Sequence, residues 1–257
     1  MATPPVIRVM EREMRVLARL WRGMIFSQFL SPVLFLAAMG LGLGGLVKEH
    51  TGNVAGLSYL DFVAPGLLAS SAMQIAANEA MWPVLGGVKW VKNYHATVAT
   101  SITAGELMVG SVLWITLRAV LSSAVFLLVA ALVGAVPSAW GLLAIPASAL
   151  CAAAFCAPLA AYSIGVDTDL VFPVIMRVLI LPLTLFSGTF FPIAQLPDWL
   201  RPFAVASPLW HGVELARHAT TGSLHLGADA VHLLVLVACT GAGLAWGRRS
   251  FTRRLAA

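Results

Sequence analysis

A single cation stands inside a long apolar stretch of this sequence. Arg118 follows Glu106 by 12 residues, and no other charged residue lies between them. On a helix this separation corresponds to about 18 Å, well inside a lipid bilayer. An ionisable group at that depth must face protein groups or an aqueous cavity, because exposure to lipid is costly. Arg118 is therefore suited either to contact an anionic substrate group, such as phosphate, or to hold helices together through an ion pair or carbonyl contacts.

Two amides, Gln74 and Asn78, also lie in apolar surroundings and are four residues apart, so they share one helix face. Such amides either connect helices or line a path for substrate, and with Arg118 they are our candidates for a translocation path. The carboxylates of Asp61 and Glu79 lie near opposite ends of one apolar stretch. They cannot form the membrane-depth carboxylate pair of an intramembrane enzyme, and no carboxylate near the midplane supports a proton-coupled carrier.

Metal-binding residue types are present but poorly arranged. Four histidines are spaced seven residues apart: His211, His218, His225 and His232. This spacing would align them on one helix, but glycines at positions 212, 222 and 227 interrupt it, so we expect no metal site. The three cysteines, at positions 151, 156 and 239, lie in apolar runs without a CxxC pair. They are expected to be small buried hydrophobic side chains.

Catalytic and nucleotide-binding motifs are missing from the sequence. It contains no G-x-x-x-x-G-K-[ST], no H-E-x-x-H, no G-x-S-x-G and no dinucleotide glycine fingerprint. We therefore expect no catalytic residues and no enzyme activity of the chain itself. Any energy source for its function must come from another protein.

The composition excludes an ordinary soluble fold. Of the 257 residues, 60% are hydrophobic and 11% are charged, against roughly a quarter charged in soluble domains. The mean hydropathy is +0.89. We predict an all-α integral membrane protein whose residues 1–257 form one domain with six spans. The expected spans are residues 24–47, 61–81, 107–136, 140–166, 170–191 and 230–247.

Basic residues predict the orientation. Twelve of the 16 Lys and Arg residues fall in the N-terminal segment, in the loop after the second span, at the start of the fifth span and in the C-terminal tail. With six spans all four regions lie on one side, and the positive-inside rule makes that side, with both termini, cytoplasmic. A cleavable signal peptide is not expected, because the first apolar run is too long and begins after about 23 residues.

The N-terminal segment carries two stripes of helical spacing. Apolar residues occupy positions 7, 10, 14, 17 and 21, and arginines occupy positions 8, 12, 15, 19 and 22. This pattern predicts an amphipathic helix over residues 5–22, lying on the cytoplasmic membrane surface. A basic flank that only sets the topology is the alternative.

Two connecting segments have unusual compositions. Residues 86–106 form the longest cytoplasmic loop, whose aromatic, basic and Thr-rich parts suit either an interfacial loop or a short helix that docks on a partner. Residues 192–217 are too rich in proline for one helix and too apolar for a solvated loop. They are expected to form two short helices that re-enter the outer leaflet, with their irregular backbone buried in protein.

The same external segment has a familiar order. Residues 186–200 read Phe-Ser-Gly-Thr-Phe-Phe-Pro-Ile-Ala-Gln-Leu-Pro-Asp-Trp-Leu, residues 207–211 read Ser-Pro-Leu-Trp-His, and residues 214–217 read Glu-Leu-Ala-Arg. This string resembles the signature of type-2 ABC exporter permeases. Residues 59–67 (YLDFVAPGL) look like the start of that family's second span, and residues 100–106, ending in Ala-Gly-Glu, look like its coupling region. The resemblance covers nearly the whole chain and points first to nodulation-type lipooligosaccharide export permeases, then to daunorubicin-type drug-efflux permeases.

The resemblance implies a subunit that pairs with a second permease copy, as a homodimer or a heterodimer, and with two copies of a separate ABC ATPase. ATP and Mg²⁺ would bind that ATPase, whereas this chain binds no cofactor, metal or nucleic acid. The residues implied to couple to the ATPase are His95, Thr97, Thr100, Ser101, Thr103 and Glu106. The helix beside the ATPase would use Arg8, Arg12, Arg15, Arg19 and Trp21. The external motif comprises Gly188, Phe190, Pro192, Pro197, Trp199, Pro208, Glu214 and Arg217.

These observations predict the permease subunit of an ATP-driven exporter in a bacterial inner membrane, embedded among membrane lipids. Its expected substrate is a lipooligosaccharide, a glycolipid or a lipid-linked glycan, moved outward. Export of a hydrophobic drug is the alternative. A membrane enzyme, an assembly protein and a carrier independent of ATP are more remote, the last because no internal repeat is visible.

Overall fold

The computed structural model describes residues 4–15, 18, 34, 38, 54 and 56–255. The expected first span, residues 24–47, falls outside the described residues except at two isolated positions. Arg19 and Trp21 of the expected amphipathic helix also lie outside them.

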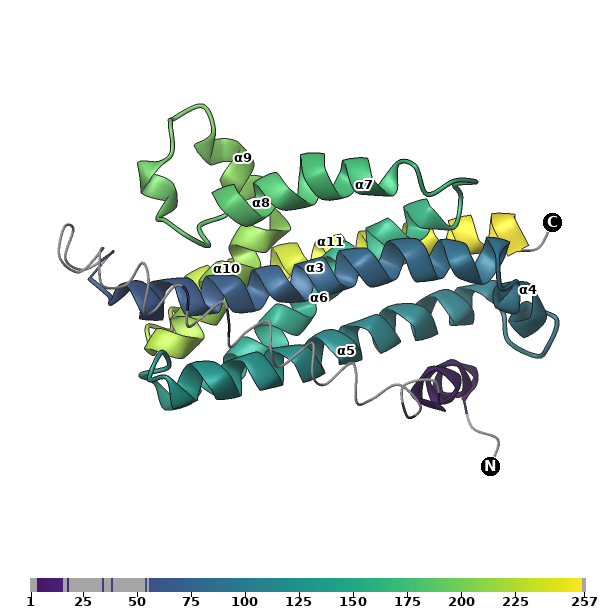
Figure 1. The fold of residues 1–257 in the computed structure, drawn as a ribbon, viewed down its shortest axis with the longest axis horizontal. Coiled ribbons are helices and arrows are strands. Elements are labelled where there is room, and N and C mark those ends of the chain that lie inside the picture. Colours follow the sequence, from purple (N-terminus) through teal and green to yellow (C-terminus); the bar gives the residue numbers. More distant parts are fainter. Residues whose placement is uncertain are drawn as a thin grey trace.

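Four long helices run alongside one another (Figure 1). They are α3 (Tyr59–Lys89), α5 (Ala104–Leu132), α6 (Ala144–Ser163), which is preceded by the 3-10 turn η2 (Ala139–Leu143), and α11 (Leu226–Leu255). The alanine-rich helix α6 packs against the other three, because its small side chains allow close approach on several sides. Apart from one isolated bridge between Val54 and Leu57, the described residues contain only helices and turns.

Each of these four helices is long and apolar enough to cross a membrane. The all-helical, membrane-embedded class predicted from composition is therefore confirmed. A fifth apolar helix, Phe172–Phe186, consists of α7 (Phe172–Ile175), the π-helical turn η3 (Met176–Ile180) and α8 (Leu181–Phe186). It is shorter than the 170–191 span that we expected, since the chain turns at Gly188, where φ is +77°.

Two of these helices, α3 and α11, extend at both ends beyond the spans expected from apolar runs. The span expected at 61–81 corresponds to α3, and that at 230–247 to α11. The span expected at 107–136 starts earlier and ends at Leu132, just before Gly134 with φ +85°. The fourth, expected at 140–166, comprises η2 and α6 and ends at Ser163.

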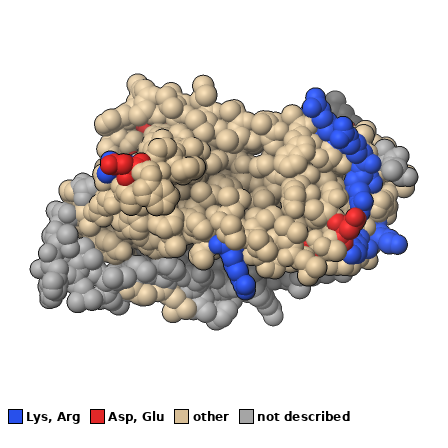
Figure 2. All heavy atoms as spheres, turned by 90° about the horizontal axis from the view of Figure 1, so that it is seen from above, with Lys and Arg blue, Asp and Glu red and all other residues tan. Residues whose placement is uncertain are grey.

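The two ends of the bundle differ in charge. One end, which we call the basic end, carries α4 (Asn93–Val98), the start of α5 and the C-terminus. Figure 2 shows lysine and arginine side chains gathered there, whereas the middle of the surface in view is almost free of charge. The residues that give this end its charge include Lys89, Lys92, Arg248, Arg249, Arg253 and Arg254. The opposite end, the far end, carries η4 (Ile193–Gln195), α9 (Arg201–Ala206) and α10 (Pro208–Thr221).

Candidate functional site

Residues 5–15 form a helix that crosses the start of α5 at the basic end (Figure 1). Val9 is only 3% exposed, and a Cβ atom on Gly110 of α5 would lie 2.8 Å from the Val9 Cβ. Ile7 and Met14, which belong to the expected apolar stripe, are exposed. Among its described residues the helix therefore uses Val9 to pack on the protein, while Ile7 and Met14 face away from it.

The short helix α4 is held firmly against the bundle. Tyr94 is buried, its ring lies 6.1 Å from the Phe251 ring, and its hydroxyl lies 3.5 Å from the Ser111 Oγ. A Cβ atom on Gly87 would lie 2.7 Å from the Tyr94 ring, so the end of α3 must be glycine for this ring to fit. Burial raises the pKa of Tyr94 to about 12, which keeps its hydroxyl neutral.

The residues expected to couple to an ATPase lie on and after this helix. His95, Thr100, Ser101 and Thr103 are exposed, while Thr97 and Glu106 are partly buried. Thr103 and Glu106 form a capping box, in which the Thr103 Oγ1 accepts from the Glu106 amide at 3.3 Å and the Glu106 carboxylate accepts from the Thr103 amide at 2.8 Å. The region that the resemblance implies for coupling is therefore divided: α4 ends at Val98, and the capping box starts α5.

A groove of about 350 Å³ opens between residues 12–13, the end of α3, α4 and α5. Its lining contains aromatic rings as well as charged and amide side chains. The aromatic, charged and polar residues of this lining are Arg12, Glu13, Glu79, Trp82, Trp90, Asn93, Tyr94, Ser111 and Trp114. The side chain of Arg12 is held at the wall by Glu13 at 2.6 Å and by the Thr97 Oγ1 at 3.5 Å.

Arg118 forms an ion pair with Glu79 of α3, one of the groove residues. The two side chains are 13% and 23% exposed, and the Arg118 Nε finds no partner among the described residues. The ion-pair alternative is thus the one observed. Gln74 and Asn78 share an exposed face of α3, as expected, and the Asn78 amide donates to the Gln74 carbonyl of its own helix at 2.8 Å.

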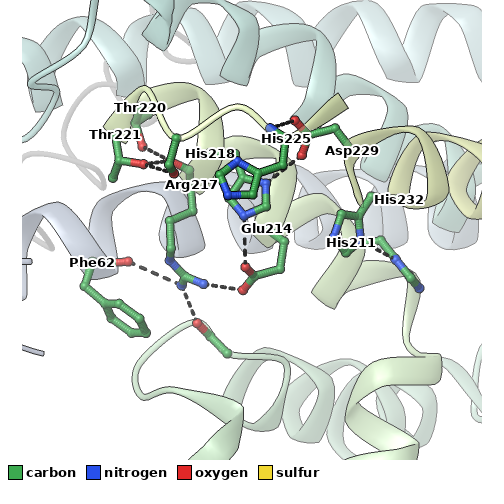
Figure 3. Close-up of polar contacts among 12 residues, drawn as sticks. Phe62, His211, Glu214, Arg217, His218, Thr220, Thr221, His225, Asp229 and His232 are labelled. Carbon is green, nitrogen blue, oxygen red and sulfur yellow. Dashed lines mark hydrogen bonds and ion pairs between the residues drawn. The ribbon is translucent and has the colours of Figure 1, made fainter. Parts of the chain in front are cut away.

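At the far end, Arg217 joins three segments (Figure 3). Its guanidinium donates to Glu214 at 2.5 Å, to the Gly188 carbonyl at 2.6 Å and to the Phe62 carbonyl at 3.4 Å. It also lies 4.1 Å from the centroid of the Phe62 ring. Arg217 thus connects α10 to α3 and to the turn after α8.

Other residues of the external motif shape this turn. Ser207 caps α10 by accepting from the Leu209 amide at 3.2 Å, and Pro208 occupies its first turn. Phe190 packs beside the cluster that includes Phe62. Pro192 precedes η4, Pro197 accepts from the Leu200 amide, and Trp199 is 71% exposed. The expected pair of short helices corresponds to α9 and α10, which the fold places side by side.

The four histidines are also brought together, which we did not expect from the interrupting glycines. Gly222, with φ +77°, ends α10 and turns the chain so that α11 returns beside it. His211 and His232 face each other with 2.7 Å between their Nδ1 atoms (Figure 3). His218 contacts Asp229 at 2.6 Å and stacks on His225. No group with the geometry of a metal site occurs among the described residues.

Comparison with known proteins assigns the chain to a family. The family described as ABC-2 type transporter matches residues 6–220. The chain belongs to this family. Proteins named nodulation protein J are similar to it: the one from Rhizobium leguminosarum bv. viciae is 30% identical, with 82% of each chain covered. Those from Bradyrhizobium diazoefficiens (31%, with 84% of each covered) and Sinorhizobium fredii (32%, with 76% of this chain and 73% of that protein covered) are similarly related.

The predicted resemblance to type-2 ABC permeases of the nodulation type is thereby confirmed. Membership of this family identifies a membrane-embedded transport subunit that associates with an ABC ATPase. Several residues that hold the candidate site were missed from sequence. Val9 was hidden because it lies between the two predicted stripes, and Glu79 was placed near the membrane surface, too far from Arg118.

Proposed function

We propose that this protein is the permease subunit of an ATP-driven exporter that moves an amphipathic lipooligosaccharide or glycolipid outward across a bacterial inner membrane. In this proposal the basic end faces the cytoplasm, two permease copies form the path, and each binds one ATPase subunit that holds ATP and Mg²⁺. The names of the relatives, nodulation protein J, and the family support this assignment.

The observation that carries the coupling proposal is the exposed turn after α4. His95, Thr100 and Ser101 are exposed at the basic end, yet the helix beneath them is locked by buried Tyr94 and followed directly by the capped α5. A partner that pushes on this turn would act on α5 through its N-cap Thr103 and through the contact between the Tyr94 and Ser111 hydroxyls, which joins α4 to α5. An ATPase that closes on ATP can therefore transmit its motion to a long membrane helix.

The helix at residues 5–15 would complete this surface. It is tied to α4 through Arg12 and Thr97, and Val6 lies with Thr103 and Arg248 around a second small hollow. Three separate segments of the chain therefore converge where the ATPase would bind. Export of a hydrophobic drug is the second possibility for the substrate, since exposed apolar side chains of α5 and α11 would suit it as well.

To test this proposal, the tagged chain is purified from its native membrane and the co-purified proteins are identified. We expect a stoichiometric P-loop protein and ATP hydrolysis that is inhibited by vanadate. Ser101→Arg should lower ATPase recovery by about fivefold or more, as for a residue near the centre of an interface. The matched control is Ser223→Arg, an exposed serine at the far end, which should have no effect. A stable preparation without any nucleotide-binding partner would refute the proposal.

A further inference from the structure

The groove at the basic end has the lining of a ligand site. We propose that it binds the neutral saccharide head group of a membrane lipid. Its volume of about 350 Å³ falls within the range of small-molecule pockets. The inference rests on the proposed export function and assigns the place where a lipid-linked substrate is first held.

Four aromatic side chains line the groove. They are Trp82, Trp90, Trp114 and Tyr94. The ring of Trp90 is 57% exposed and lies over Gly86, where a Cβ atom would be 3.2 Å from its Cε3 atom. Sugar rings present faces of C–H groups, which pack favourably on the electron-rich faces of indoles. Trp90 can provide such a face at the mouth of the groove.

A polar atom in the groove also lacks a partner. The Asn93 Oδ1 is buried and accepts no hydrogen bond within the described part of the chain. A buried acceptor without a donor costs free energy, which a ligand hydroxyl would recover once a rotation of the Asn93 side chain turns its Oδ1 toward the groove. The Ser111 hydroxyl, which lies 3.5 Å from the Tyr94 hydroxyl, is a second neutral group able to donate or accept.

The charges favour a neutral head group over a phosphate. Glu13 is paired with Arg12, and Glu79 is paired with Arg118, so the formal charges of the two pairs cancel. Each pair therefore offers an anionic phosphate no net positive charge. Hydroxyl groups can instead donate to the free lone pairs of the same carboxylates without breaking either ion pair.

The position of the groove suits a lipid. Trp90 and Val91 are exposed beside its mouth, next to the basic residues Lys89 and Lys92. Tryptophan is favoured at the level of lipid head groups, with lysines reaching the charged surface. A saccharide in the groove would therefore leave its acyl chains free to remain in the membrane.

The test uses the permease with its ATPase in phosphatidylcholine nanodiscs that contain a diazirine-labelled monoglucosyl diacylglycerol. After irradiation, labelled peptides are mapped by mass spectrometry. We expect labelling of the peptide that contains Trp82–Tyr94. Trp90→Ala should reduce it roughly two- to tenfold, the range of one aromatic contact, and Asn93→Leu should also reduce it. Trp90→Phe, which keeps a ring, should retain most of the labelling.

The matched control is Trp140→Ala, because Trp140 is similarly exposed, at 60%, but lies at the far end. A diazirine-labelled phosphatidylglycerol tests the charge argument and should label the groove weakly. Equal labelling by both lipids, labelling at other peptides only, or unchanged labelling of Trp90→Ala would overturn the inference. ATP hydrolysis in the same nanodiscs separates the two proposals: an active complex with an unlabelled groove refutes only the head-group site. A labelled groove without ATPase association would refute the proposed function instead.

Discussion

The Arg217 guanidinium donates to the Gly188 carbonyl at 2.6 Å, across 29 positions of the chain. Through this bond and the ion pair with Glu214, the turn after α8 is fastened to α10 and α3. Glu214 also lies 3.7 Å from the His218 Nε2, so one carboxylate connects the arginine contacts to the histidine cluster. The far end is therefore held by buried polar contacts as well as by apolar packing.

Glu214→Ala should lower the free energy of unfolding by about 3 kcal/mol, because it leaves the buried Arg217 without its charged partner. Asp198→Ala is the matched control. Asp198 also forms an i,i+3 pair, with Arg201, but it is 93% exposed, and its loss should change stability by less than about 1 kcal/mol. Thermal unfolding in detergent measures both variants, and equal effects would contradict a structural role for the buried pair.

Gly66→Ala should destabilise the protein by about 1–3 kcal/mol. A Cβ atom at Gly66 would lie 2.8 Å from the backbone of Thr189, which cannot move aside as a flexible side chain can. Gly241→Ala is the control, since nothing lies within 4 Å of its added Cβ and alanine favours a helix. The same thermal assay should show a loss for the first variant only.

Glu79→Ala should also reduce stability, by about 3 kcal/mol, because Arg118 then stays inside the bundle without a carboxylate. The double substitution Glu79→Leu with Arg118→Leu should recover much of that loss if the pair serves packing alone. If Arg118 instead contacts substrate, the double variant should be stable but lose substrate-stimulated ATP hydrolysis. The comparison of melting temperature with hydrolysis rate distinguishes these roles.

Thr103→Val should destabilise the first turn of α5 by about 0.5–2 kcal/mol, since valine cannot cap the helix. Thr103→Ser keeps the hydroxyl and should behave like the parent protein. The expected functional result is weaker stimulation of ATP hydrolysis with ATPase binding largely intact. If Thr103→Val instead binds less ATPase, but each bound ATPase is stimulated as in the parent protein, Thr103 has no role in transmitting motion.

Acid pH should destabilise the far end. Burial lowers the pKa of His211, and the neighbouring imidazole of His232 lowers it further. The unfolded chain then binds more protons than the folded one below about pH 6.5, so stability is full above that pH and is lost as the pH falls. Melting temperatures at pH 7.5 and 5.5 measure the effect, and the difference should shrink in His211→Gln. If the difference in melting temperature is as large in His211→Gln as in the parent protein, other titratable groups cause the pH dependence.

Much of the fold could be predicted because lipid imposes simple rules. Long runs without charge located α3, α5, α6 and α11, and the signature from Phe186 to Arg217 identified the family. Contacts between different helices of the bundle were harder to predict. The distance from Glu106 suggested the depth of Arg118, but its partner Glu79 lies on another helix whose rotation no single sequence reveals.

The candidate site was predicted in location more than in detail. The sequence singled out the loop at residues 86–106, and the structure places there a short helix that ends at Val98, followed by a new helix that Thr103 and Glu106 cap. The histidines were judged separated by glycine. Gly222 instead reverses the chain and brings the histidines of α10 and α11 together. The seven-residue spacing could not predict this, because it was interpreted on one continuous helix.

The short helix Phe172–Phe186 has a consequence for the surrounding membrane. Its 15 residues span about 22 Å, less than the roughly 30 Å hydrocarbon layer, and its outer side chains, such as Val174, Val178 and Leu181, are exposed. Ser187 and Thr189, which follow this helix, are buried in protein. If this helix crosses the bilayer as the fifth span, lipids at this face would have to shorten to match it, and the bilayer would be thinner there. A polar head group crossing beside this helix would meet a lower barrier than elsewhere around the protein.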